Sequence, residues 1–184
     1  MPETELTPFQ QAKRRLYAMR NGIVADTLRK SGCPYRLIYG VNLPQLTEIA
    51  SMTEKSEELA QGLWDDMDLR ESRLLAAMLF PIESITMEKA RRMVDSFKWQ
   101  EDADIACFKL FRNTNFASSL AHELCRSEKT LDRYTGLRLW FNIVSKYPDE
   151  ALRAAREELK RENPISGLAS MLAEEAELIK DFRS

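Results

Sequence analysis

The sequence predicts an all-α fold, and three observations lead to that prediction. Only 6 Gly and 7 Pro occur among the 184 residues, which leaves little material for the tight turns of a many-stranded sandwich. Apolar side chains recur at the three- and four-residue spacing of an amphipathic helix. The stretches between these periodic segments are short, as is typical of antiparallel helix pairs. We therefore expect one helical domain over residues 1–184.

The first element begins at the stretch Thr7-Pro8-Phe9-Gln10. Its threonine can cap a helix, its proline suits the first helical position and its glutamine can complete a capping box. This helix is predicted to run to Lys30, because Ser31-Gly32-Cys33-Pro34 is a stop signal. A short apolar connection over residues 35–41 follows, and Asn42-Leu43-Pro44 opens the next helix.

Eight further helices are predicted from apolar spacing and from start and stop residues. They cover residues 54–64, 69–80, 87–97, 102–111 (starting at 101 or 102), 116–125, 131–145, 149–161 and 166–182. Pro81 ends the second of these helices and Thr86 caps the third. Two helices with their turns recur about every 35 to 45 residues, which is the period of HEAT-like arrays. The pattern alone is also compatible with a plain helical bundle.

Composition excludes several classes of function. No apolar run approaches the ~20 residues of a membrane helix, and the polar start MPETELTPFQ does not have the form of a secretory signal. The three cysteines, Cys33, Cys107 and Cys125, are far apart and accompany one histidine, which argues against a zinc site. No glycine-rich phosphate loop is present, so no nucleotide cofactor is expected. These features favour a reduced, cytoplasmic protein without a metal, a cofactor or a membrane partner.

Four stretches then follow one another in a recognisable order. They are Tyr39 to Pro44, Leu63-Trp64 with Arg70 to Ala77, Trp99 to Asp104, and Leu131-Asp132-Arg133. They resemble the "LGV…P", "LW…REE…AA", "WWDxVD" and "WLxRxA" motifs of the AlkD-like DNA alkylation-repair family. The resemblance spans roughly residues 24–144, and it implies a HEAT-repeat DNA glycosylase that removes positively charged alkylated purines from duplex DNA without flipping the base.

The resemblance also implies roles for single residues. Asp104 falls at the family's catalytic aspartate, which stabilises the cationic sugar electrostatically. Arg133 falls at the arginine that grips a phosphate. Trp99 matches the first tryptophan of the pair, while Gln100 stands where the second, substrate-contacting tryptophan belongs, so a cation–π contribution is missing there. Thr130 replaces the tryptophan of the last motif.

Structural roles compete with each of these assignments. An acid near a helix start, such as Asp104, is favoured by the helix dipole alone. Trp99 is more typical of core or helix-end packing than of a substrate contact. Arg133 can pair with Asp132 or Glu128 on a solvated face.

Two functions from different classes therefore remain open. Basic residues concentrate over residues 13–36 and 89–92, despite a net charge of -2. If these residues line a concave face they form a track for the phosphates of duplex DNA, and otherwise they are solvated helix surfaces. The alternative to a glycosylase is a catalytically inactive HEAT-repeat scaffold that binds DNA or a protein partner on its concave face.

Overall fold

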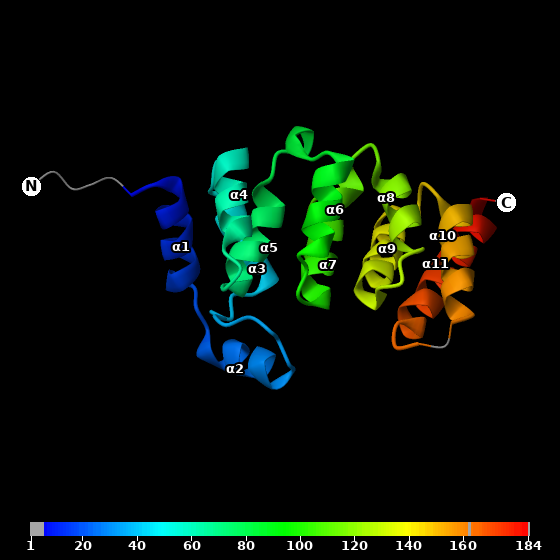
Figure 1. Cartoon of the computed structure of the whole chain (residues 1–184), viewed down its shortest axis with the longest axis horizontal. Coiled ribbons are helices and arrows are strands. Elements are labelled where there is room, and N and C mark those ends of the chain that lie inside the picture. The colour runs from blue at the N-terminus through cyan, green and yellow to red at the C-terminus, as the bar shows by residue number, and fades with distance from the viewer. Residues whose placement is uncertain (1–5, 162, 184) are drawn as a thin grey trace, which may run out of the picture. The chain divides into compact units, whose positions relative to one another are not determined.

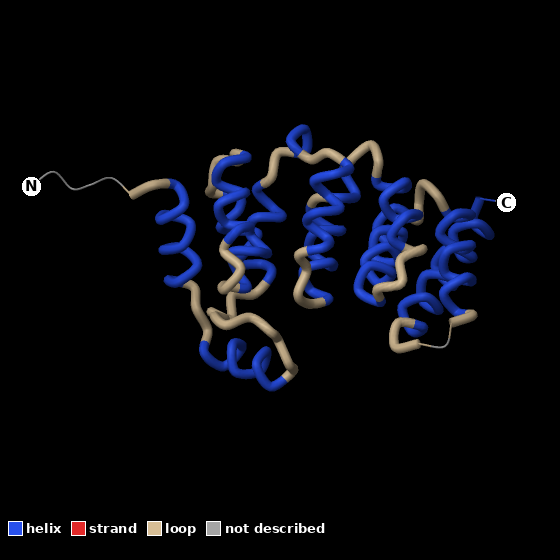
Figure 2. The backbone as a smooth tube through the Cα atoms, viewed as in Figure 1, coloured by secondary structure: helices blue, strands red, loops and turns tan. Residues whose placement is uncertain are grey.

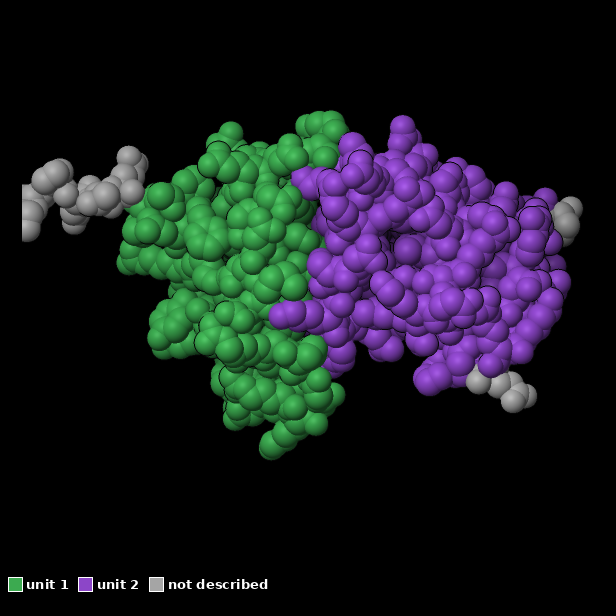
Figure 3. Space-filling view, in the orientation of Figure 1, with its two compact units in different colours: residues 1–84 green, residues 85–184 purple. Residues whose placement is uncertain are grey.

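The computed structural model describes residues 6–161 and 163–183. Within these ranges it contains eleven α-helices, two short 3-10 helices and no strand, so the predicted all-α fold is confirmed. The residues group into two compact units, Met1–Ser84 and Ile85–Ser184 (Figure 3). Whether the chain acts as the one domain expected over residues 1–184 stays a prediction. No helix in the described ranges is both long and apolar enough to cross a bilayer.

The first unit is built around a completely buried helix. Its helices are α1 (Pro8–Ala18), α2 (Gly22–Lys30), α3 (Leu43–Ser51), α4 (Glu57–Asp65) and α5 (Arg70–Leu79), followed by the 3-10 turn η1 (Ile82–Ser84). All 10 residues of α5 are buried, and α1, α3 and α4 pack against it (Figure 1). The capping box expected at Thr7 begins α1, and α3 starts at Asn42 as expected, with a second capping box there.

The long helix predicted from Pro8 to Lys30 is wrong, because the chain breaks at residues 19–21. Met19 caps the end of α1, and the Oδ1 atom of Asn21 accepts hydrogen bonds from the backbone N–H groups of Ile23 and Val24. Asparagine competes well for backbone donors and therefore favours a cap over a helix interior. Apolar residues keep helical spacing on both sides of the break, so periodicity predicted one continuous helix.

A buried carboxylate organises the connection between α2 and α3. Glu71 on α5 is 0% exposed and accepts hydrogen bonds from the backbone N–H groups of Tyr39, Gly40 and Val41. Gly40 has a φ of 77°, and a Cβ there would lie 2.2 Å from the carbonyl oxygen of Asn21. The chain thus turns sharply against α2 at a position that only glycine fits.

The second unit consists of α6 (Met87–Asp95), α7 (Gln100–Lys109), α8 (Ala117–Leu124), α9 (Thr130–Ile143), α10 (Pro148–Leu159) and α11 (Ser166–Arg183), with the 3-10 turn η2 (Phe111–Asn113) after α7. The pairs α8–α9 and α10–α11 are hairpins joined by short loops, visible in Figure 2. Helix α9 packs on α7 as well as on α8. The predicted helices of this unit agree with the observed ones to within a few residues at each end.

Candidate functional site

Asp104 lies on α7 with its carboxylate turned toward α9. The hydroxyl group of Tyr134 donates a hydrogen bond of 2.8 Å to its Oδ1 atom. The Nε atom of Arg138 lies 2.7 Å from the same oxygen, although its N–H is not aligned as a hydrogen bond. The contact with Arg138 is therefore an ion pair, in which the two side chains are 32% and 30% exposed. Solvent and a ligand can still reach this carboxylate.

Asp104 affects the protonation of Tyr134, and Arg138 offsets the charge of Asp104. Burial, followed by the charge of Asp104 and its hydrogen bond, raises the pKa of Tyr134 well above the ordinary value of a phenol. The tyrosine hydroxyl therefore remains a donor at every physiological pH. Arg138 offsets the negative charge of Asp104, so the pair is close to neutral in the unbound protein.

Arg133 does not contact Asp104 but binds a glutamate and two backbone carbonyl groups. Its side chain is 8% exposed, and its Nε atom donates to both carboxylate oxygens of Glu158 on α10, each at 3.2 Å. Its Nη1 atom donates to the carbonyl oxygens of Ser127 and Glu128 in the loop before α9. Arg133 thus ties α9 to α10, and its assignment to a phosphate stays a prediction. The arginine that the fold brings to Asp104 is Arg138.

Trp99 and Gln100 stand at the start of α7. Trp99 is the N-cap residue and is half-buried, and its backbone N–H donates to Asp102 at 3.2 Å. Asp102 is the acid that caps this helix, since it also accepts from the N–H of Lys98 at 2.8 Å. Gln100 is exposed and precedes Asp104 by one helical turn, so the two share a side of α7. Substrate contacts of Trp99 and Gln100 stay predictions.

The side of α7 that carries Gln100 and Asp104 also carries an aromatic residue that was not predicted as part of the site. Phe108, one turn beyond Asp104, is 39% exposed. The Nζ atom of Lys109 lies 4.9 Å from the centre of its ring and the guanidinium carbon of Arg112 lies 4.4 Å from it. We call Gln100, Asp104, Phe108, Tyr134 and Arg138 the α7–α9 face.

Sequence reasoning missed Tyr134 and Arg138 for one reason. Tyr134 and Arg138 are four residues apart and so lie on one side of a helix, a signal that was available. Nothing in the sequence, however, indicated that this side of α9 packs beside Asp104 on α7. Motif comparison placed the arginine by its position within a short stretch, whereas the packing of two helices decides which arginine reaches the carboxylate.

Comparisons with known proteins bear on the fold and the family. No curated protein matches the chain. A solved structure described as a new family of proteins related to the HEAT-like repeat DNA glycosylases, with affinity for branched DNA structures, aligns with a TM-score of 0.72. The alignment covers 84% of this chain and 67% of that chain at 16% identity, so it shows a shared HEAT-like fold. The family model described as DNA alkylation repair enzyme matches residues 12–179. The chain therefore belongs to the DNA alkylation repair enzyme family.

Proposed function

We propose that this protein binds duplex DNA through the α7–α9 face and removes positively charged alkylated purines, with Asp104 as the catalytic carboxylate. The observation that carries the proposal is the position of that carboxylate. It is half-exposed, and Tyr134 and Arg138 on the neighbouring helix hold it in one orientation. Membership of the DNA alkylation repair family supports the substrate class.

The chemistry needs a negative charge more than it needs an acid or a base. An alkylated purine that already carries a positive charge is a good leaving group, and positive charge develops on the sugar as the glycosidic bond breaks. A carboxylate held beside that sugar stabilises the developing charge. The Tyr134 hydroxyl keeps the carboxylate in place without neutralising it, because the phenol stays protonated.

Arg138 decides how much of that negative charge is available. A DNA phosphate is a strong partner for a guanidinium group and competes with Asp104 for it. When Arg138 turns to a phosphate, the charge of Asp104 is no longer offset. We therefore assign the phosphate contact next to the lesion to Arg138, with Arg133 holding α9 against α10.

The rest of the α7–α9 face offers contacts that suit a nucleic acid. Phe108 exposes a ring flanked by the cations of Lys109 and Arg112. Aromatic rings stack on bases or sugars, and nearby cations bind phosphates with an affinity that falls steeply with salt. Residues 85–184 contain 17 basic and 17 acidic side chains, so binding has to come from such local clusters.

A second candidate is DNA binding without base release. Two observations favour it: Arg138 offsets the charge of Asp104, and an exposed amide, Gln100, stands where the related enzymes have a tryptophan. Both lower the stabilisation that the site can give to a cationic sugar. This candidate keeps the same DNA-binding face and differs only in the chemistry.

Two measurements separate these candidates. Fluorescence anisotropy with a labelled duplex tests binding from low to moderate salt, and release of methylated purines from treated duplex DNA tests catalysis. We expect Asp104→Asn to abolish release while binding persists. The matched control is Asp95→Asn, which removes an exposed carboxylate of α6 that pairs with Lys129, the residue before α9, and should leave release unchanged.

The outcomes are distinct. Binding with Asp104-dependent release supports the glycosylase, and Gln100→Trp should then increase the rate. Binding without release in the unaltered protein supports the second candidate. Absence of duplex binding at low salt excludes both, and release that survives Asp104→Asn removes Asp104 from the mechanism.

A further inference from the structure

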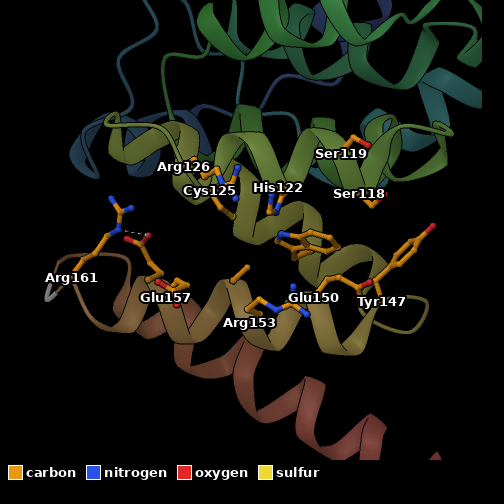
Figure 4. A pocket seen from close by; sticks show the side chains of 13 residues that line it. Ser118, Ser119, His122, Cys125, Arg126, Tyr147, Glu150, Arg153, Glu157 and Arg161 are labelled. Carbon is orange, nitrogen blue, oxygen red and sulfur yellow. Dashed lines mark ion pairs between the residues drawn. The ribbon is translucent and has the colours of Figure 1, made fainter.

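A cleft of about 590 Å³ lies in the second unit, lined by residues of α8, α9 and α10. Trp140 of α9 is part of the lining, and side chains of α8 and α10 face each other across the cleft (Figure 4). None of Asp104, Trp99, Gln100 or Arg133 lines it. Pockets of this volume commonly hold small molecules. The cleft is therefore a second site, separate from the α7–α9 face.

Some of the arginine side chains that line the cleft form no ion pair with a carboxylate among the described residues. Arg161 lies 3.8 Å from Glu158, which is itself taken by the buried Arg133. Arg126 and Arg153, in contrast, have no carboxylate within ion-pair distance among the described residues. They stand on opposite sides of the cleft, one just after α8 and the other on α10. Two guanidinium groups that no carboxylate pairs favour an anionic ligand beside them, in a cleft that Glu150, Glu157 and Glu158 also line.

Trp140, part of the lining of the cleft, has a buried indole N–H. Trp140 is 2% exposed, and its Nε1 atom makes no hydrogen bond within the described part of the chain. The thiol of Cys125 lies beside it, but sulfur is a weak acceptor and the N–H is not aligned with it. The Nε1 atom is itself buried, so Trp140 presents its ring, rather than its N–H, to the cleft.

The remaining lining indicates an aromatic ligand that is bound without covalent chemistry. Tyr147 exposes its ring at one end of the cleft, packed edge-on against Trp140 with 6.2 Å between ring centres. Glu150, next to it, offers an acceptor for an amino group. Burial raises the pKa of Cys125 to about 12, so the thiol stays protonated and does not act as a nucleophile.

We propose that this cleft binds a mononucleotide with an amino-bearing base. Its phosphate lies between Arg126 and Arg153, its ring stacks along Tyr147, and its base donates to Glu150. The inference goes beyond the proposed function, because it concerns other residues and needs no duplex. Two sources share this chemistry: a free nucleotide and the 5′-phosphorylated nucleotide at a DNA strand end.

The test follows the indole N–H signals of the full-length protein by ¹H–¹⁵N NMR, with the Trp140 signal assigned through Trp140→Phe. The probes are AMP, adenosine, and a short single-stranded oligonucleotide with or without a 5′-phosphate. We expect AMP to shift the Trp140 signal at millimolar concentration and adenosine to bind at least about 10-fold more weakly, because a charged hydrogen-bonded contact is lost.

Arg153→Gln should weaken the response to AMP about 10-fold or more, for the same reason. Its control is Arg156→Gln on the same helix, which removes the same charge from an exposed pair with Glu177 outside the cleft. Native NMR spectra of both variants show whether the fold is kept. A shift with AMP assigns the source to free nucleotides, and a shift only with the 5′-phosphorylated strand assigns it to strand ends. The proposal is overturned if neither AMP nor the 5′-phosphorylated strand shifts the Trp140 signal. It is also overturned if adenosine binds as tightly as AMP, or if Arg153→Gln and Arg156→Gln respond equally to AMP.

Discussion

The buried carboxylate of Glu71 allows a quantitative prediction about the first unit. Its Oε1 atom accepts from the backbone N–H groups of Gly40 at 2.9 Å and Val41 at 3.3 Å, and from the Nη1 atom of Arg70 at 2.6 Å. Its Oε2 atom accepts from the N–H of Tyr39 at 3.0 Å. The substitution Glu71→Gln keeps the shape but replaces one oxygen with an N–H₂ group. That N–H₂ group faces other donors, and the buried ion pair between Glu71 and Arg70 is lost.

The expected loss follows from these contacts. A hydrogen bond to a charged group contributes about 1.5–3 kcal/mol, and removing one partner of a buried ion pair costs about 3–5 kcal/mol. Because both effects involve the same oxygens they do not add, and we expect Glu71→Gln to destabilise the first unit by about 3–5 kcal/mol. Most of this is the cost of losing the ion pair between Glu71 and Arg70 and of leaving one backbone N–H without its carboxylate acceptor.

Hydrogen exchange measured by mass spectrometry on peptides from α4 and α5 reports the stability of this unit separately. A loss of about 3–5 kcal/mol corresponds to protection factors at least about 100-fold lower, if exchange requires opening of the unit. Asp26→Asn is the control, since it removes an exposed carboxylate of the same unit, paired with Arg29, and should change stability by less than about 0.5 kcal/mol. A loss below about 1 kcal/mol for Glu71→Gln would refute this reasoning.

Three further predictions concern packing, pH and thiol reactivity. Gly136→Ala should lower the urea midpoint, because the added Cβ would lie 2.9 Å from the backbone of α8, whereas Gly62→Ala, whose Cβ meets a side chain at 3.5 Å, should raise it slightly through helix propensity. Burial opposes ionisation of Asp66, but its hydrogen bonds, above all that from Lys13, lower its pKa overall. The stability it contributes is therefore present above the ordinary carboxyl pKa and is lost as the pH falls through the lowered value, so Asp66→Asn should flatten the decline of the urea midpoint below about pH 4. Burial raises the pKa of Cys107, and native protein should show no iodoacetamide labelling at Cys107 at pH 8, as mass spectrometry can check.

Local signals predicted most of the helices because their causes are local. The caps at Thr7, Asn42 and Thr86 form with their own chain neighbours, and the apolar spacing that repeats along each helix depends only on its own residues. The break at Asn21 was the exception. Asn21 can continue a helix or cap a new one, and local spacing does not decide between the two. The connection over residues 37–41 favours the cap, because the N–H of Asn21 donates to the carbonyl oxygen of Tyr39 at 2.7 Å.

The sequence by itself determined the helical class and the place of Asp104 on a helix, because periodicity and a motif are properties of neighbouring residues. Only the tertiary structure decided which side chains surround that carboxylate. The family motif indicated Arg133 for a phosphate contact, which stays a prediction. In the structure Arg133 is a buried partner of Glu158, and the packing of α9 on α7 brings Tyr134 and Arg138 to Asp104. Contacts between helices depend on how two surfaces fit together, and residues 25 or more positions apart carry no local signal of that fit.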